Sequence, residues 1–223
     1  NTFREIEGLG DLDGDGNPDI AVADFNANGD GKNNLGAVHI LRLNSDGTVK
    51  DSSTIKNSAT WNPTNAGMNI FMNMFGRIIT TIGDQDGDGV VDLAVTSEVS
   101  VGISGDMETY IILLHLNGDG TLKDVSRLAY GNNGVSGLDT LRSIYSMTSI
   151  GDIDGNGVGD IAVSGEGSIG WVDNQEVLTF LKMNSNGTVK GILTLPNLGG
   201  SDVTSIANID GSTTLGIGMP YFG

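Results

Sequence analysis

The chain contains no cysteine and only four prolines among its 223 residues. Without cysteine it can form no disulfide bond, no thiolate metal site and no thiol nucleophile. So few prolines, beside 35 glycines spread along the chain, indicate many tight turns rather than disorder or a collagen-like repeat. There is no apolar run long enough to cross a bilayer and no recognisable signal peptide. The sequence therefore predicts a domain with a buried core and without membrane insertion.

Positive charge is scarce as well. Eleven lysines and arginines face 28 aspartates and glutamates, which gives a net charge of -17. A surface this acidic repels phosphate and argues against nucleic acid as a partner. The length allows one large all-β domain or two small ones. Because the chain begins at Asn1, without methionine, we expect a leader or preceding domains to have been removed.

One acidic pattern occurs three times, in residues 11–19, 84–92 and 152–160, which we call the first, second and third acidic loops. Each loop has aspartate at positions 1, 3 and 9, aspartate or asparagine at position 5, and glycine at positions 4 and 6. Carboxylates so spaced repel one another unless a cation lies between them. Hard oxygen donors in a flexible, glycine-bearing loop favour calcium over zinc or copper.

The predicted calcium ligands are the side chains at positions 1, 3, 5 and 9 and the backbone carbonyl at position 7. They are Asp11, Asp13, Asp15, Asn17 and Asp19 in the first loop, Asp84, Asp86, Asp88, Val90 and Asp92 in the second, and Asp152, Asp154, Asn156, Val158 and Asp160 in the third. We expect about three calcium ions per chain, with the weakest binding in the third loop, because asparagine replaces one aspartate there.

The EF-hand is the rival interpretation of such loops. It requires a bidentate glutamate at position 12 and a helix on either side. Position 12 is Val22, Val95 or Val163 here, each inside a predicted strand. The EF-hand is therefore excluded, and we expect the carboxylate at position 9 to replace that glutamate.

A second motif, Asn-x-Asp/Asn-Gly-Thr-Val/Leu-Lys, ends residues 43–50, 116–123 and 183–190. Its copies are 73 and 67 residues apart, and the acidic loops are 73 and 68 residues apart. Two different motifs that recur with nearly the same spacing indicate a structural repeat. The Asp-Gly or Asn-Gly pair in each copy predicts a two-residue hairpin turn in which both residues take positive φ.

Each repeat contains four predicted strands. The first strands are 77–82 and 146–150, the second 19–23, 92–96 and 160–164, the third 37–43, 110–116 and 177–183, and the fourth 48–55, 121–128 and 188–195. The second strands are almost wholly apolar, which predicts burial on both faces. Repeated units of four antiparallel strands predict an all-β chain of β-propeller blades, with the calcium loops between first and second strands.

The predicted organisation is a single propeller segment, 1–223. Its blades cover approximately 1–68, 69–140 and 141–198, and a partial fourth covers 199–223. In this last unit the acidic loop has lost most of its acids.

These features resemble the FG-GAP repeat, which builds the β-propeller of integrin α-subunits and of many bacterial surface proteins. The resemblance rests on Phe75-Gly76, the Ile-Gly-Asp that opens the second and third acidic loops, the loops themselves and the Gly-Met-Pro at 218–220. The first copy has Phe3-Arg4 in place of Phe-Gly. Because the family usually closes a ring of seven blades, the resemblance implies an excerpt of a longer protein. The alternative is a half-ring completed by a homo-oligomer partner.

The resemblance implies a secreted or cell-surface module of bacterial type, for adhesion or for binding a protein or carbohydrate ligand, in which calcium is structural. Two other roles remain open: a self-assembling repeat of a surface layer or fibre, and an accessory, non-catalytic propeller of a secreted carbohydrate-active enzyme. No nucleophile with an adjacent base and no GxSxG or HExxH motif is found. We therefore expect no enzymatic activity.

Two weaker signals are set aside. The run 24–30 alternates oxygen-bearing side chains and could hold a further ion, but the other repeats have no counterpart, which favours a plain polar loop. His39 and His115 lie at non-equivalent positions of their third strands. Unmatched histidines favour packing or surface roles over a binding site.

Overall fold

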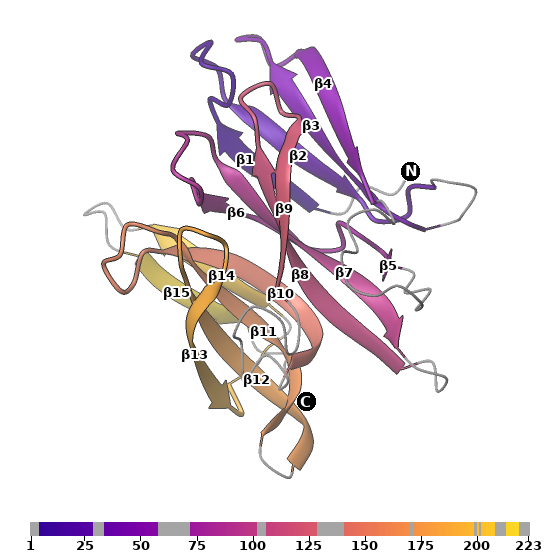
Figure 1. Cartoon of the computed structure of the whole chain (residues 1–223), viewed down its shortest axis with the longest axis vertical. Coiled ribbons are helices and arrows are strands. Elements are labelled where there is room, and N and C mark those ends of the chain that lie inside the picture. The colour runs from indigo at the N-terminus through magenta and orange to yellow at the C-terminus, as the bar shows by residue number, and fades with distance from the viewer. Residues whose placement is uncertain are drawn as a thin grey trace. The chain divides into compact units, whose positions relative to one another are not determined.

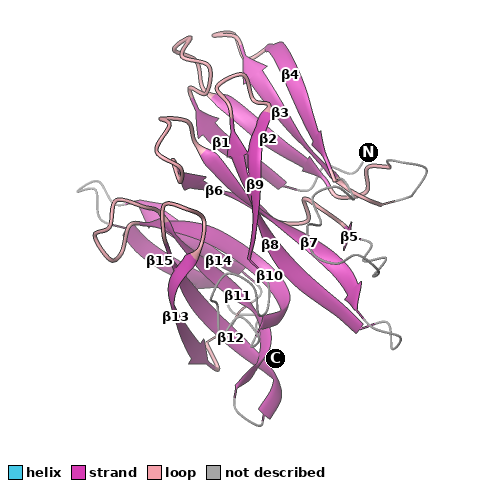
Figure 2. Ribbon diagram, in the orientation of Figure 1, coloured by secondary structure: helices cyan, strands magenta, loops and turns pink. Residues whose placement is uncertain are grey.

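The computed structural model describes residues 5–28, 34–57, 72–101, 106–128, 141–169, 172–198, 200, 202–207 and 213–218. All regular elements in these ranges are strands, as Figure 2 shows. No helix that could span a membrane occurs among them. The chain divides into two compact units, Asn1–Thr81 with Gly89–Arg127 and Ile82–Asp88 with Leu128–Gly223.

The first sheet is an antiparallel meander, in which each strand pairs with the next along the chain (Figure 1). Its strands are β1 (Glu5–Gly10), β2 (Asp19–Asp24), β3 (Ala37–Leu43) and β4 (Val49–Lys56). The predicted bounds of the third strand are confirmed to the residue. Ala21 and Ala23 of β2 are fully buried and Val22 is nearly so, which confirms that this strand is covered on both faces.

The second sheet has a divided first strand. Its strands are β5 (Met72–Asn73), β6 (Ile79–Gly83), β7 (Asp92–Val101), β8 (Asp106–Leu116) and β9 (Leu122–Leu128). Both β5 and β6 pair with β7, and β8 and β9 follow in order. The apolar residues Leu93, Ala94 and Val95 of β7 are fully buried, as in the first sheet.

The third sheet repeats the meander with β10 (Leu141–Gly151), β11 (Asp160–Ile169), β12 (Val172–Met183) and β13 (Val189–Pro196). A separate pair follows, β14 (Asp202–Ala207) with β15 (Thr213–Gly218). Val203 of β14 packs in one core cluster with Ile150, Ala162 and Leu178 of the third sheet. The four-stranded sheets are blades of the β-propeller type, as predicted.

Second and third strands are longer than predicted in two of the blades. The pairing of β7 with β8 continues to Val101 and Asp106, and that of β11 with β12 continues to Ile169 and Val172. These extensions are rich in polar residues, so the apolar pattern that marks the strands did not reveal them. Backbone pairing along a hairpin needs no apolar face, which is why the strands continue.

The predicted two-residue hairpin turns are wrong. Only the glycine of each pair takes positive φ: Gly47 at 79°, Gly120 at 72° and Gly187 at 71°. In the first blade the amide of Asn44 donates to the carbonyl of Thr48 at 2.8 Å, which leaves three residues in the turn. The carboxylate of Asp46 accepts both the amide and the hydroxyl of Thr48. This side chain closes the turn without positive φ at its own position.

Phe75 joins the first two blades within the first unit. Its ring is fully buried, its amide donates to the carbonyl of Leu35 at 3.2 Å, and its backbone forms a parallel bridge with Gly36. Gly36 has a φ of 88°, and a Cβ there would overlap the carbonyl oxygen of Phe75 and lie 2.7 Å from its carbonyl carbon. Only glycine allows the two backbones to approach so closely.

We predict that Gly36→Ala lowers the free energy of unfolding by about 2–4 kcal/mol, because it combines positive-φ strain with a backbone clash. Thermal unfolding of the purified chain measures the effect. Gly8→Ala is the matched control, since Gly8 lies on β1 and a Cβ there has no heavy atom within 4 Å. Equal losses in the two variants would contradict this account of the junction.

Candidate metal centres

Each acidic loop gathers its carboxylates at one end of its sheet. Three groups of side chains have ligand atoms within 4.8 Å of one another: Asp11, Asp13 and Asp15; Asp84, Asp86 and Asp88; and Asp152, Asp154 and Asp160. Positions 1, 3 and 5 therefore meet in the first two loops, and positions 1, 3 and 9 in the third. Each loop connects the first strand of its blade to the second, where the sequence predicted it.

The aspartate at position 1 organises its loop through backbone amides. Oδ1 of Asp152 accepts the amide hydrogens of Gly155 at 2.7 Å and Asn156 at 3.1 Å, and Oδ2 accepts that of Gly157 at 2.7 Å. These bonds, with Gly157 the strongest, hold the pKa of Asp152 below its usual value. Gly155 and Gly157 both have positive φ, which lets the chain wrap around the carboxylate. Asp152 is thus ionised at neutral pH.

The same wrapping occurs in the other two loops. Asp11 accepts the amides of Asp15 and Gly16 at 3.0 and 2.8 Å. Asp84 accepts those of Gly87 and Asp88 at 2.7 and 3.1 Å. Three loops with nearly the same hydrogen bonds share one conformation, which the glycines at positions 4 and 6 make possible.

The aspartate at position 9 is the first residue of the second strand and is removed from water. Asp19 is 1% exposed, and Asp92 and Asp160 are 0% exposed. In each blade its Oδ1 accepts the amide of the last residue of the third strand: Leu43 at 2.9 Å, Leu116 at 3.0 Å or Met183 at 2.8 Å. In the first and third loops its Oδ2 accepts the amide at position 2, from Leu12 or Ile153.

This aspartate therefore ties the loop to the third strand, a role that the sequence analysis did not assign to it. A carboxylate oxygen has two lone pairs, so an oxygen that accepts one amide can still approach a cation. Valine stands at position 12 of the loops, within β2, β7 and β11, which agrees with the exclusion of the EF-hand.

Positions 5 and 7 also bond within the loops. The Oδ1 atom of Asn156 accepts the amide of Val158 at 2.8 Å, and its Nδ2 donates to the carbonyl of Met183 at 2.7 Å. In the first loop Oδ1 of Asp15 accepts the amide and the side-chain Nδ2 of Asn17. Val90 is half-buried.

Asp154, at position 3 of the third loop, has one carboxylate oxygen without a donor. Its side chain is 10% exposed, and Oδ1 is buried and accepts no hydrogen bond from any described residue. Its Oδ2 lies 2.9 Å from Nζ of Lys190. A buried anionic oxygen that lacks a donor costs several kcal/mol of free energy, which a bound cation would offset. The atoms of this group that could bind a metal are all carboxylate oxygens, from Asp152, Asp154 and Asp160, and oxygen ligands suit calcium.

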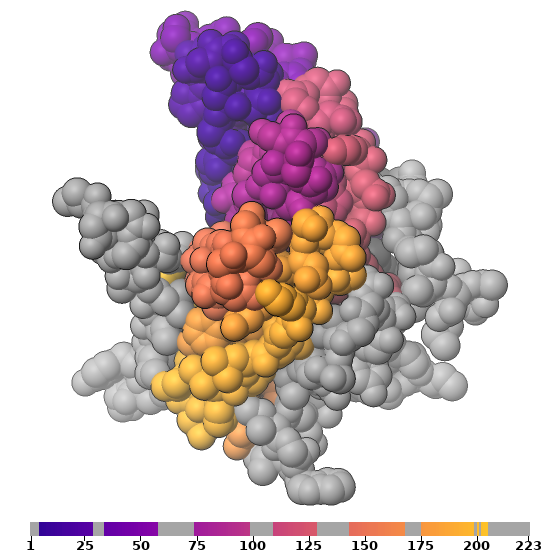
Figure 3. Space-filling model, turned by 60° about the vertical axis from the view of Figure 1, so that its left-hand side comes forward, coloured from indigo at the N-terminus to yellow at the C-terminus, as the bar shows by residue number. Residues whose placement is uncertain are grey.

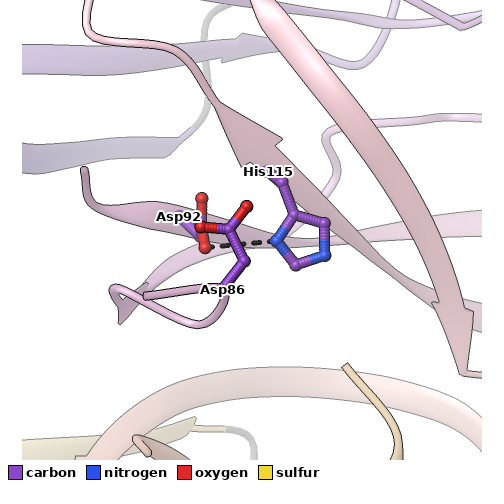
Figure 4. Close-up of side chains that lie close together, drawn as sticks. All are labelled: Asp86, Asp92 and His115. Atoms are coloured by element: carbon purple, nitrogen blue, oxygen red, sulfur yellow. Dashed lines mark hydrogen bonds and ion pairs between the residues drawn. The ribbon is translucent and has the colours of Figure 1, made fainter. Parts of the chain in front are cut away.

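The second blade has a buried histidine beside its acidic loop. His115 is 4% exposed, and its Nδ1 lies 3.2 Å from Oδ2 of Asp92 (Figure 4). Its Nε2 lies 3.4 Å from the Ser126 hydroxyl. Asp86, Asp92 and His115 also have ligand atoms within 4.8 Å of one another. A packing or surface role was predicted for this histidine, and its aspartate partner was missed.

A comparison of the third strands could have indicated that His115 occupies a functional position. When the strands are aligned at their last residues, His115 occupies the same position as Arg42 and Lys182. A side chain that can carry positive charge therefore recurs at this position of the third strand. In the first blade Arg42 lies between two acids, with Nη2 2.5 Å from Asp51 and Nε 3.9 Å from Asp13.

The run 24–30 shows no comparable gathering of acids among its described residues. Asp24 is 2% exposed and accepts the amide of Asn26 at 3.2 Å. Asp30 lies outside the described residues, so a further ion in this run remains a hypothesis.

Residues 3–41 match the family model of the FG-GAP repeat. The match extends from the start of the first blade through the first acidic loop into β3, and it confirms the resemblance drawn from the motifs. None of the curated protein sequences matches the chain.

We predict that Asp160→Asn lowers the free energy of unfolding by about 2–4 kcal/mol, even in chelator. The side-chain NH2 of the new asparagine would face the backbone N–H of Ile153 or of Met183. Two donors cannot form a hydrogen bond, so one buried amide would lose its acceptor. Denaturant unfolding in the presence of a chelator isolates this effect from metal binding. Asp124→Asn, an exposed site on β9, is the control. The hydrogen-bonding role is contradicted if both variants unfold at the same denaturant concentration.

Proposed function

With an FG-GAP repeat at its start and blades of the β-propeller type, we propose that the chain is a calcium-stabilised propeller module that binds ligands outside the cell. Calcium is structural in this proposal. It holds the loop between the first and second strands of each blade, and the carboxylates of the loops take no part in catalysis.

One observation carries the calcium assignment: the buried Oδ1 of Asp154 accepts no hydrogen bond from the described part of the chain and lies in a group with Asp152 and Asp160. An amide or hydroxyl would have satisfied this atom if it were only part of a polar turn. The first and second loops bring the same kinds of oxygens together. The predicted order of affinity, with the third loop weakest, stays part of the proposal because it follows from ligand charge.

Calcium availability supports an extracellular location. Loops of this kind, without a bidentate glutamate, belong to the class of extracellular modules with dissociation constants of about 10⁻⁴–10⁻³ M. Free calcium reaches such concentrations outside cells. At a free concentration about ten times the dissociation constant, one site adds about 1.4 kcal/mol to the free energy of unfolding. Several such sites would be a large part of the stability of a domain.

The binding role rests on the FG-GAP family, whose repeats occur in extracellular proteins such as integrins. The acidic composition, with a net charge of -17, argues against nucleic acid as a partner on electrostatic grounds. We propose a protein or a carbohydrate as the ligand.

We predict that isothermal titration calorimetry detects about three calcium ions per chain, and that Asp154→Ala removes about one of them. Asp154 supplies a charged ligand to only one loop, so the other two sites should keep their affinity. Asp124→Ala, which removes an exposed acid outside the loops, should leave the stoichiometry unchanged.

Equal stoichiometry in the wild type and Asp154→Ala would contradict the assignment of the third loop. The absence of any calcium binding would contradict the proposed function. The binding role is tested separately with beads coated with the chain, whose capture of extracellular proteins or polysaccharides should require calcium. No capture from either class of ligand would contradict that role.

A further inference from the structure

A lysine occupies the same irregular position in two of the blades. In the first sheet Arg42 pairs with Asp51 and Leu43 pairs with Val49, so Lys50 is an extra, unpaired residue of β4. In the third sheet Lys182 pairs with Gly191 and Met183 with Val189, which leaves Lys190 unpaired in β13. Each is a β-bulge, a feature that redirects a side chain relative to its strand.

Both redirected lysines contact the aspartate at position 3 of their acidic loop. Nζ of Lys50 lies 2.8 Å from Oδ2 of Asp13 and 2.6 Å from Oδ2 of Asp15. Nζ of Lys190 lies 2.9 Å from Oδ2 of Asp154. In the space-filling view the third loop and the hairpin before Lys190 form two adjoining orange lobes (Figure 3). The two contacts occur in different compact units, so one packing accident does not explain both.

Charge complementarity accompanies the contacts. The hydrogen bond from Lys50 is the largest cause of the lowered pKa of Asp15, and the bond to Asp154 raises the pKa of Lys190. The side chains of Lys50 and Lys190 are roughly half exposed, at 41% and 49%. Water and salt reach them, so each interaction is modest in strength and sensitive to ionic strength.

We propose that Lys50 and Lys190 are resident counterions of the first and third acidic loops, which hold each loop folded without calcium and lower its affinity for calcium. This inference rests on the proposed function, because it concerns the affinity of the same sites. The lysine is the last residue of the repeated motif at 43–50 and 183–190. The hairpin turn accounts for the Asn, Asp or Asn, Gly and Thr residues of that motif. The counterion role accounts for the lysine that ends it.

The two effects have one physical origin. In a metal-free loop the ammonium reduces repulsion among three or four carboxylates, so the folded loop gains stability. In the third loop Nζ of Lys190 contacts Oδ2 of Asp154, while Oδ1 accepts no hydrogen bond within the described ranges. An ion can therefore enter without expelling the lysine. The ammonium then repels the divalent ion and lowers the affinity, as expected where affinity follows net ligand charge.

The test uses Lys50→Met and Lys190→Met, alone and together, in the whole chain. Methionine keeps an unbranched, flexible stem and removes the ammonium group, with its charge and its hydrogen bonds. Lys56→Met is the matched control, because Lys56 lies exposed on β4, the same strand as Lys50, and forms no ion pair with a described residue. Calcium titration calorimetry gives the dissociation constants, and thermal unfolding in chelator gives the metal-free stability.

Each lysine variant should lower the calcium dissociation constant of its loop about three- to tenfold. In chelator it should lower the melting temperature by roughly 2–5 °C. Lys56→Met should change neither quantity. The proposal requires both tighter calcium binding and a lower metal-free melting temperature. It is overturned if a variant binds calcium more weakly or with an unchanged dissociation constant, or if its metal-free melting temperature is unchanged. If the wild type binds no calcium, the proposed function fails and this proposal fails with it. If the wild type binds calcium and the variants match it, this proposal alone fails.

Discussion

A carboxylate buried against backbone amides holds the loop end of each blade together. Asp19, Asp92 and Asp160 are at most 1% exposed, and each accepts the amide of the last residue of the third strand. A buried charge is tolerated only where hydrogen bonds and opposite charge offset the loss of water. Because this aspartate begins the second strand, its position also sets where the acidic loop ends.

The other features at this end of the blade follow from that constraint. The loop adds two or three more acids at positions 1, 3 and 5, so a cluster of like charges must be neutralised where few amide groups remain available. Lys50 and Lys190 supply permanent positive charge from the fourth strand. Calcium would supply the rest, in proportion to its concentration. Under this proposal, the stability of a blade depends partly on its own residues and partly on the calcium concentration around it.

Sequence pattern predicted the repeat well, because its signals are local. The alternation of loops and apolar strands located β2 and β3 closely. The acids predicted to converge do so in part: positions 1 and 3 meet in every loop, with position 5 in two loops and position 9 in the third. Their role as calcium ligands stays a prediction. Contacts that depend on a neighbouring strand were missed. The bulges at Lys50 and Lys190 appear only in the strand register, and the pairing of His115 with Asp92 joins residues 23 positions apart. The hairpin turns were wrong because the Asp46 side chain closes the turn.

The account depends most directly on cations that neutralise the clustered carboxylates. The decisive measurement is the melting temperature of the chain in chelator and in millimolar calcium, at constant ionic strength, with magnesium as the control ion. The account predicts a rise of several degrees in calcium and a smaller rise in magnesium, which demands a tighter, octahedral shell. The same melting temperature in chelator and in calcium would contradict it.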